Sequence, residues 1–222
     1  MSENVILTLE NIKKSYFVEG HRIDVLRGIN LTLKEGERLS LTGKSGSGKT
    51  TLLSLISGLE RKYEGEILYD GNDLSKMNLD KYRNSDIGIV FQSYNLLPQF
   101  TAEENIILSM DISNVKDVDK KEKALELMKQ VGLNKSLAKR RVLKLSGGEQ
   151  QRIAIARSLS YNPKIIIADE PTGNLDKETE NEILKIFNNL AHKENKCVII
   201  VTHSGNVCDS VDQVYDLKKS KK

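Results

Sequence analysis

The sequence has few of the residues that form disulfide bonds, and it has no apolar segment long enough to cross a membrane. It has 222 residues, with no tryptophan, three prolines and two cysteines. Cys197 and Cys208 stand in no C-x-x-C or Cys/His ligand spacing, so we expect reduced thiols rather than a disulfide or a zinc site. No apolar run reaches the roughly 20 residues that a membrane-crossing helix needs, and Met1–Asn4 lacks the basic-then-apolar start of a signal peptide. We therefore expect the chain to stay in the cytosol unless a partner holds it elsewhere.

A large excess of charge is also missing. The formal net charge is +3, and four lysines cluster near the end of the chain, at Lys218, Lys219, Lys221 and Lys222. This balance is too mild to indicate binding to nucleic acid, so we expect no nucleic-acid partner. The lysine cluster favours a solvated tail over a binding patch. A hydrophobic fraction of 38% and a charged fraction of 29% are typical of soluble globular proteins.

The hydrophobic pattern predicts an α/β fold. Alternating runs at Ile6–Leu9 and Ile29–Leu33 indicate half-buried antiparallel strands. A strand at Arg38–Thr42 is followed, after a glycine loop, by a helix at Thr50–Ile56 that ends at Gly58. Three short continuous apolar runs indicate strands buried on both faces, as in a parallel sheet: Ile87–Phe91, Ile165–Ala168 and Val198–Val201.

Helices interrupt the strand pattern in the middle of the chain. No strand signal occurs from about Thr101 to Leu159, where Lys121–Val131 and Gln151–Leu159 have helical periodicity. We interpret residues 1–222 as a single domain, with a helical subdomain at about 101–159 inserted into the α/β core. A further helix is expected to begin near Asp176, and Val214–Leu217 is expected to close the sheet.

A phosphate-binding loop is predicted between the strand at Arg38–Thr42 and the helix that follows it. The sequence there fits G-x-x-x-x-G-K-[ST] in the strand–loop–helix context that this pattern requires. Its members are Gly43, Lys44, Ser45, Gly46, Ser47, Gly48, Lys49 and Thr50. The glycines let successive N–H groups curl around phosphate oxygens, Lys49 supplies a positive charge, and Thr50 offers a hydroxyl to Mg²⁺. The less favoured alternative is a flexible glycine loop that merely contains a lysine.

Two carboxylates follow the apolar run Ile165–Ala168. A buried parallel strand would deliver Asp169 to the carboxyl edge of the sheet, where ligands bind in open α/β folds. Asp169 then suits the environment of the Mg²⁺, as in other phosphate-loop NTPases. Glu170 is the next residue and points elsewhere, which suits it to orient or deprotonate an attacking water. An acidic pair alone is more often a surface turn, but the phosphate loop favours the site.

The stretch LSGGEQQR, at Leu145–Arg152, has two compatible interpretations. Ser146 and Glu149 have the spacing of a capping box, in which each side chain bonds the other residue's backbone N–H at the start of a helix. Two glycines ahead of a helix also leave bare N–H groups at the positive end of the dipole, which is an anion site. The residues of this stretch alone do not separate the two.

In combination, these motifs resemble the ATP-binding subunits of ABC transporters, over about Leu7 to Leu217. The resemblance rests on the phosphate loop, Gln92 after the strand Ile87–Phe91, LSGGEQQR, IIIADE at Ile165–Glu170, Asn174–Asp176 and His203, in this order. Val25–Ile29, Ile87–Gln92 and DEPTGNLD at Asp169–Asp176 are similar to one branch, which includes lipoprotein-release, macrolide-export and antimicrobial-peptide-resistance ATPases and the ATPase of the bacterial cell-division complex. The resemblance implies the ABC ATPase fold: a P-loop NTPase core with an antiparallel β-subdomain and an inserted α-helical subdomain.

The resemblance further implies a homodimer in the ATP-bound state. Two copies would pack head to tail, so that Ser146, Gly147 and Gly148 of one lie over the γ-phosphate held by the phosphate loop of the other. Glu149 stands where glutamine is commonest across the wider superfamily. Because a carboxylate aimed at the triphosphate would repel it, we expect Glu149 to turn back and cap its own helix.

Other roles carry over from the family residue by residue. Tyr16 matches the aromatic that stacks on adenine, with a strand-edge tyrosine packed on the core as the alternative. Gln92 resembles the residue that bridges Mg²⁺ and water to the helical subdomain, with an ordinary loop glutamine as the alternative. His203 matches the histidine that contacts the γ-phosphate, and Thr51 extends the nucleotide contacts of the phosphate loop.

Two further positions bear on the loops around the site. Asp176 resembles the residue that links the two sites across the dimer, or it is the N-cap of the following helix. Ser204 stands where an acidic residue is frequent after the histidine, a departure that leaves the catalytic assignment intact.

The first functional hypothesis is therefore an ATPase that uses ATP and Mg²⁺ and drives integral membrane permease subunits from the cytoplasmic face of the membrane. In the family, the region matching Tyr94–Phe100 receives the membrane partner, with packing in the core of the helical subdomain as the alternative for Leu96 and Leu97. The alternative is a regulatory module whose membrane partner controls an extracellular cell-wall enzyme, with nothing transported. Soluble ABC proteins of translation or DNA repair are disfavoured, because the chain has one phosphate loop and no long coiled-coil or metal-binding insertion.

Overall fold

The computed structural model describes residues 4–217 of the chain. Residues 1–3 and the C-terminal lysine cluster, of which a solvated tail was expected, lie outside the described residues. In chain order, the helices and strands are β1 (Val5–Val18), β2 (His21–Lys34), β3 (Arg38–Thr42), α1 (Lys49–Ile56), β4 (Glu64–Tyr69), β5 (Asn72–Asp73), α2 (Leu79–Ser85), β6 (Ile87–Val90), α3 (Ala102–Ile112), α4 (Lys120–Gln130), α5 (Gly147–Ser158), β7 (Ile165–Asp169), α6 (Lys177–His192), β8 (Cys197–Val201), α7 (Gly205–Ser210) and β9 (Gln213–Asp216).

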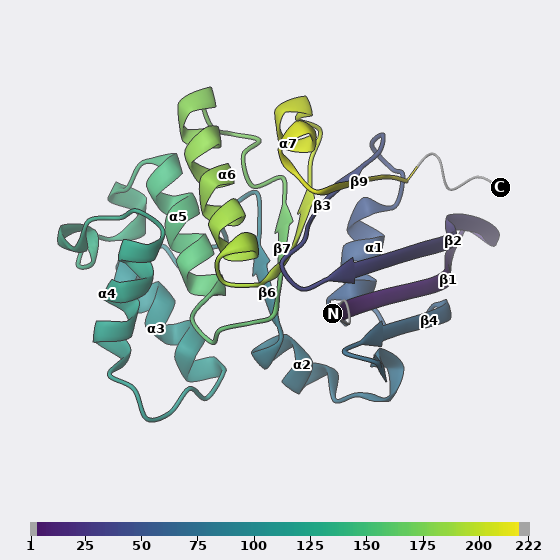
Figure 1. Ribbon diagram of the computed structural model, residues 1–222, viewed down its shortest axis with the longest axis horizontal. Coiled ribbons are helices and arrows are strands. Elements are labelled where there is room, and N and C mark those ends of the chain that lie inside the picture. The colour runs from purple at the N-terminus through teal and green to yellow at the C-terminus, as the bar shows by residue number, and fades with distance from the viewer. Residues whose placement is uncertain (1–3, 218–222) are drawn as a thin grey trace.

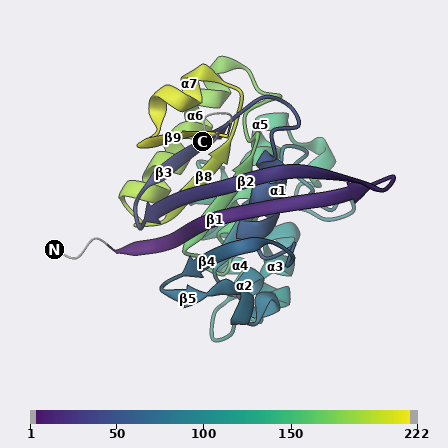
Figure 2. The ribbon, with the colours of Figure 1, turned by 90° about the vertical axis from the view of Figure 1, so that its right-hand side faces the viewer.

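A long hairpin dominates the antiparallel sheet, whose strand order is β2-β1-β4-β5. β1 and β2 pair over their whole length, with Leu9 opposite Leu31 and Val18 opposite His21. Figure 2 shows the hairpin passing across α1. The predicted strands at Ile6–Leu9 and Ile29–Leu33 are confirmed, but they are only the buried halves of longer strands. The outer halves are mostly exposed, although Lys14 is buried and Phe17, Val18 and Ile23 are apolar, and they hold strand geometry through pairing with each other.

The parallel sheet has the order β6-β7-β8-β3-β9, and every pair in it is parallel. Its strands match the predicted runs to within a residue or two. β7 and β8 are buried on both faces, apart from partly exposed Asp169 at the end of β7. Parallel strands all end at one edge, so the loops after β3, β6, β7 and β8 gather there.

Two apolar cores lie on opposite faces of the parallel sheet. Ile166 and Ala168 face a core that includes α3, α4, α5 and α6, whereas Ile165 and Ile167 face a core that includes α1 and the antiparallel sheet. The same alternation divides β8 between the two cores. This is the period-two pattern of a strand buried on both sides.

Helices α3, α4 and α5 occupy the stretch between β6 and β7, and they gather at the end of the molecule away from the hairpin (Figure 1). The helices predicted at Lys121–Val131 and Gln151–Leu159 are confirmed as α4 and α5, but α5 begins four residues earlier than the periodicity indicated, at Gly147. α3 was not predicted. Along residues 4–217, no helix is both long and apolar enough to cross a membrane.

Candidate active site

The phosphate loop runs from the end of β3 to the start of α1 and is held by its own lysine. The Lys49 ammonium, only 8% exposed, donates to the carbonyl oxygens of Gly43 at 2.7 Å and Lys44 at 3.2 Å. The Ser47 amide donates to the Lys44 carbonyl, which closes a tight turn within the loop. The loop is therefore curled around a positive charge before any phosphate arrives.

Gly48 brings the loop against the β1–β2 hairpin. Its φ is +96°, and a Cβ there would lie 2.9 Å from Cγ1 of Val25 and 2.8 Å from Cδ2 of Leu26. Val25 is an extra residue in β2, because Ser15 pairs with Asp24 while Lys14 pairs with Leu26. Such a bulge re-aims side chains. Only glycine accommodates both the left-handed backbone and this close approach.

Asp169 and Glu170 follow the buried residues of β7 and diverge as expected. Burial raises the pKa of the Asp169 carboxyl, and the positive charge of Lys49 opposes that shift. No hydrogen bond restrains the Asp169 carboxylate in the described part of the chain. Glu170 has a φ of +46°, a strained conformation for a residue other than glycine, and its amide donates to the Val201 carbonyl at 2.9 Å. This turn points two adjacent carboxylates in different directions, so that each can contact a different ligand.

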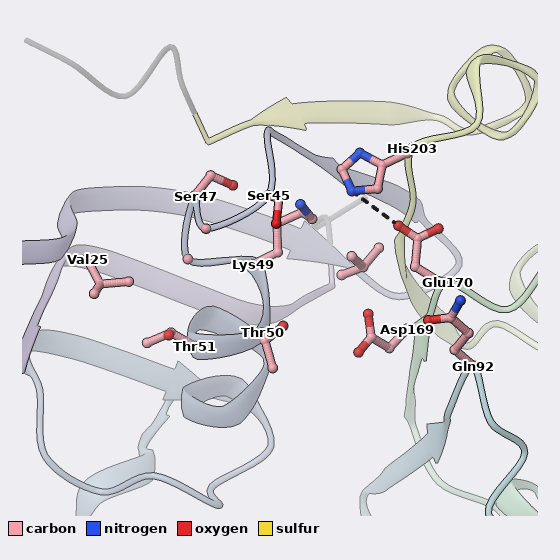
Figure 3. A pocket seen from close by; sticks show the side chains of 13 residues that line it. Val25, Ser45, Ser47, Lys49, Thr50, Thr51, Gln92, Asp169, Glu170 and His203 are labelled. Atoms are coloured by element: carbon pink, nitrogen blue, oxygen red, sulfur yellow. Dashed lines mark ion pairs between the residues drawn. The ribbon is translucent and has the colours of Figure 1, made fainter. Parts of the chain in front are cut away.

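Within residues 4–217, one oxygen of Glu170 is buried and accepts no hydrogen bond. Its Oε1 lies 3.5 Å from Nε2 of His203, close enough for attraction but without hydrogen-bond geometry. Figure 3 shows the imidazole and the carboxylate turned toward each other, on the loops after β8 and β7. A buried carboxylate oxygen without a donor leaves a strong acceptor available for a ligand or a water.

These groups surround a cavity of about 480 Å³. Its lining comprises Val25, Ser45, Gly46, Ser47, Gly48, Lys49, Thr50, Thr51, Gln92, Asp169, Glu170, Val201 and His203. A second hollow of about 560 Å³ shares Gln92, Glu170 and His203 with the first and continues past Thr172, Glu180 and Ser204. The first cavity combines a curled loop of N–H groups, a lysine and two carboxylates, so it can bind an anion while keeping acidic groups beside it.

The oxygen donors in the cavity fit Mg²⁺. Thr50, Gln92 and Asp169 supply a hydroxyl, an amide and a carboxylate, and among the described residues the Asp169 carboxylate has no hydrogen bond to lose. No group of three or more His, Cys, Asp or Glu that could hold a metal occurs between residues 4 and 217. Mg²⁺ does not need one, because it keeps several waters and binds through one or two carboxylates plus substrate phosphates.

Other predicted site residues lie outside the cavity lining. Gly43 and Lys44 contribute their carbonyls to Lys49 but do not line the cavity. Tyr16 is also outside the lining; it is 37% exposed and pairs with Ile23, two residues before Val25 on β2. At about 3.4 Å per residue, two residues of strand separate this pair from the cavity wall by roughly 7 Å.

Ser146, Gly147 and Gly148 are not part of this cavity either, and begin α5. The capping box is confirmed: the Ser146 hydroxyl accepts from the Glu149 amide at 3.2 Å, and Glu149 Oε2 accepts from the Ser146 amide at 2.7 Å. The Glu149 carboxylate thus turns back onto its own helix, as expected. The anion-site interpretation of the two glycines stays a prediction.

Asp176 is the N-cap of α6, since its side chain accepts from the Thr179 amide at 2.9 Å and the Thr179 hydroxyl at 2.8 Å. This confirms its structural interpretation and leaves the interfacial one untested.

The sequence did not reveal two residues around the site. Val25 reaches the cavity through a bulge that has no sequence signature. Glu180 of α6 accepts from the Ser204 hydroxyl at 2.9 Å and the Thr172 hydroxyl at 3.4 Å, so it joins the loops that carry His203 and Glu170. Ser204, which stands where an acidic residue is frequent in the family, is thus bonded to the carboxylate of Glu180. Only the fold brings α6 to that loop.

Sequence comparison identifies close relatives. A sequence model of the family described as "ABC transporter" matches residues 26–173. The uncharacterized ABC transporter ATP-binding protein YclH of Bacillus subtilis (strain 168) is 45% identical over 197 residues, which cover 89% of this chain and 87% of YclH. The lipoprotein-releasing system ATP-binding protein LolD of Legionella pneumophila (strain Paris) is 40% identical over 214 residues, which cover 95% and 94% of the two chains.

Structural comparison gives the same result. The dimeric, post-hydrolysis structure of the ATP-binding cassette MJ0796 bound to ADP and Pi, a protein of Methanocaldococcus jannaschii, superimposes with a TM-score of 0.86 at 37% identity. The match covers 95% of this chain and 94% of that one. The expected fold class is therefore confirmed.

Proposed function

The chain belongs to the ABC transporter family of ATP-binding subunits, which are ATPases, and we propose that it dimerises around two Mg·ATP and drives a membrane permease partner. The observation that carries the proposal is the single cavity lined by the phosphate loop, Asp169, Glu170, Gln92 and His203. These side chains come from the ends of four different strands of one sheet. Together they supply what phosphoryl transfer to water requires: phosphate ligands, groups that hold a metal, and an acceptor for a proton.

The phosphate loop would bind the triphosphate through its N–H groups. Lys49 would exchange its bonds to the Gly43 and Lys44 carbonyls for bonds to phosphate oxygens, which offer a stronger, charged acceptor. Thr50, Asp169 and Gln92 would hold Mg²⁺, which neutralises charge on the phosphate oxygens when it is bound. Tyr16 would stack on the adenine, beyond the cavity wall at Val25.

Glu170 would act on the attacking water. Its Oε1, which accepts no hydrogen bond from residues 4–217, would accept the proton while the water oxygen bonds to the γ-phosphorus and the bond to the β,γ-bridging oxygen breaks, which leaves ADP and phosphate. His203, whose Nε2 lies 3.5 Å from Oε1, would contact the γ-phosphate. The left-handed backbone at Glu170 keeps this carboxylate apart from Asp169.

A second copy would complete the site. Ser146, Gly147 and Gly148 lie outside their own chain's cavity, at the N-terminus of α5, where backbone N–H groups and the helix dipole attract anions. The solved MJ0796 cassette is dimeric. ATP that contacts both copies in the closed state and one copy in the open state has the differential affinity that drives closure.

The membrane partner would dock beside Gln92, and the chain would thereby be held peripherally at the cytoplasmic face of the membrane. In the segment after Gln92, Leu96 is partly buried against the core that includes α3, whereas Pro98 and Gln99 are exposed. The name of LolD, a lipoprotein-releasing ATP-binding protein, supports export or release as the function of the complex. Regulation of an extracellular cell-wall enzyme without transport is the alternative.

Recovery of the complex from native membranes tests this proposal. Tagged Glu170→Gln, held in the ATP-bound form with Mg·ATP, should co-purify with an integral membrane protein, identified by mass spectrometry. Lys49→Ala, which should not bind ATP, is the matched control. A permease with export partners would support transport, and a membrane protein bound to cell-wall hydrolases would support the alternative. Finding no membrane protein with either variant would contradict the coupling but not the ATPase activity.

A further inference from the structure

Lys14 is a buried lysine that takes no part in any proposed catalytic step. It lies on β1, it is 7% exposed, and its neighbour Lys13 is exposed. Its ammonium donates to the carbonyl oxygen of Lys62 at 2.6 Å and lies 3.1 Å from Oε2 of Glu60. A lysine is rarely buried without such partners, and these fix the ammonium at one point.

The fixed ammonium lies over the ring of Tyr16, 4.8 Å from its centroid. This distance is within the range of a cation–π interaction, in which the charge is attracted to the negative face of the ring. One face of Tyr16 is thus occupied by the protein, while the residue as a whole remains 37% exposed. The ring is held from one side and open on another.

The same ammonium connects the hairpin to the segment that follows the phosphate-loop helix. Glu60 and Lys62 lie between α1 and β4, and Glu60 Oε1 accepts from the Lys62 amide at 2.8 Å. That amide and the Lys14 ammonium hold the pKa of the Glu60 carboxyl below its usual range. Lys14 therefore fixes Tyr16 relative to the chain that leads from the phosphate loop.

We propose that Lys14 is a positioning residue for nucleotide recognition, which holds the Tyr16 ring at a set place so that the adenine base can stack on its open face. This inference rests on the proposed role of Tyr16. Two physical effects favour it. A ring that is already immobilised loses less freedom when the base binds. The Lys14 cation also attracts the π-electrons of the Tyr16 ring toward one face. The other face becomes less negative and therefore repels the π-electrons of the adenine less.

If the inference is right, Lys14 strengthens binding of the adenine base and does not affect binding of the phosphates. Lys14→Met keeps the apolar stem and removes the ammonium. In the hydrolysis-deficient Glu170→Gln background with Mg²⁺, titration calorimetry should show roughly fivefold weaker binding of ATP, the scale of one cation–π contact. Binding of inorganic tripolyphosphate, which has no base, should be unchanged. Lys14→Arg should retain most of the ATP affinity, because a guanidinium also binds aromatic faces.

Two controls separate this role from general electrostatics and from folding. Lys13→Met removes the same charge from the exposed neighbour and should leave both affinities unchanged. In a Tyr16→Ala background, Lys14→Met should weaken ATP binding no further, since the ring through which it acts is absent. If Lys14→Met does not fold, Lys14→Gln replaces it, because its amide can still donate to the Lys62 carbonyl.

The outcomes are distinct for the inference and for the proposed function. Equal weakening of ATP and tripolyphosphate would mean that Lys14 supports the fold of the phosphate loop, and the inference would be wrong. Unchanged ATP affinity in Lys14→Met, together with weaker binding in Tyr16→Ala, would overturn the inference alone. Unchanged ATP affinity in Tyr16→Ala would overturn the base-stacking role itself, with the inference that rests on it, and would leave the phosphate and water sites standing.

Discussion

At the scale of single residues, the proposed mechanism depends most on Glu170. Its buried Oε1 has no hydrogen bond, and its strained backbone points that oxygen toward His203. Glu170→Gln keeps the size of the side chain and removes the proton acceptor. We expect normal ATP affinity, a more stable ATP-bound dimer and turnover reduced roughly 10²-fold or more, the usual scale for a general base. A phosphate-release assay measures the turnover, light scattering measures the dimer, and titration calorimetry measures the ATP affinity.

Lys49→Ala provides the contrast, because Lys49 is proposed to bind phosphate. We expect it to lose ATP binding itself and therefore to stay monomeric. Undiminished turnover in Glu170→Gln would exclude Glu170 as the base. Normal ATP affinity in Lys49→Ala would contradict the role of the phosphate loop.

Sequence reasoning succeeded in predicting which residues of short local motifs line the cavity. The phosphate loop and the DE pair are short motifs that recur because a backbone curl or a strand end needs those residue types, so the lining residues from Ser45 to Thr51 were predicted. The contact between Val25 and Gly48 shows what this reasoning cannot predict. Their contact depends on a bulge that brings β2 against the loop, and nothing in either stretch encodes that distance.

At the scale of elements, α5 is fixed at both ends. Ser146 and Glu149 cap its N-terminus, and Arg157 in its last turn donates to the carbonyl oxygens of Tyr94, at 2.9 Å, and Asn95. Tyr94 and Asn95 have φ values of +60° and +49°, two consecutive left-handed residues just after Gln92. The Tyr94 hydroxyl also lies 3.1 Å from the position that a Cβ on Gly147 would occupy. Helix α5 therefore connects the Gln92 loop to the start of LSGGEQQR.

Arg157→Met should release the strained segment. It leaves the carbonyl of partly buried Tyr94 without its donor, at a cost of about 1–3 kcal/mol for a buried group left unsatisfied, whereas the carbonyl of exposed Asn95 can bond water instead. We expect faster hydrogen exchange at residues 93–97 and a lower turnover, because Gln92 loses its support. Arg152→Met is the matched control: Arg152 lies on the same helix but bonds Val131 and Glu182. Equal exchange at residues 93–97 in the two variants would show that Arg157 does not hold that segment.

Local signals predicted some elements and missed others for identifiable reasons. The Ser146–Glu149 spacing predicted the true start of α5, although the apolar period alone placed it at Gln151. The same spacing occurs at Thr101 and Glu104, where a capping box begins α3, so that helix had a readable signal that was not used. β4 had no comparable signal. It owes its strand conformation to pairing with β1, as with Leu68 opposite Thr8.

At the scale of the whole molecule, the parallel sheet is shared by two cores. Ile166 faces the core of the helical segment and Ile167 faces the core of the hairpin and α1, although the two residues are adjacent. The hydrophobic runs predicted strands buried on both faces, but they could not say which side chain enters which core, since both faces are apolar. The side chains of β7 therefore join regions that are far apart in sequence.

We predict that both cores unfold together. Ile166→Ala and Ile167→Ala each remove a fully buried side chain, which should lower the free energy of unfolding by about 2–5 kcal/mol. Because β7 and β8 contribute alternate residues to both cores, damage on one face loosens the strand that supports the other. Denaturant titration followed by circular dichroism should show one transition for each variant. Hydrogen exchange should rise in α4 and in the Val5–Ile12 half of β1 alike, whichever isoleucine is replaced. Protection of β1 that survives in Ile166→Ala while α4 loses it would instead mean that the helical segment unfolds as a separate unit, and residues 1–222 would then not be a single cooperative domain.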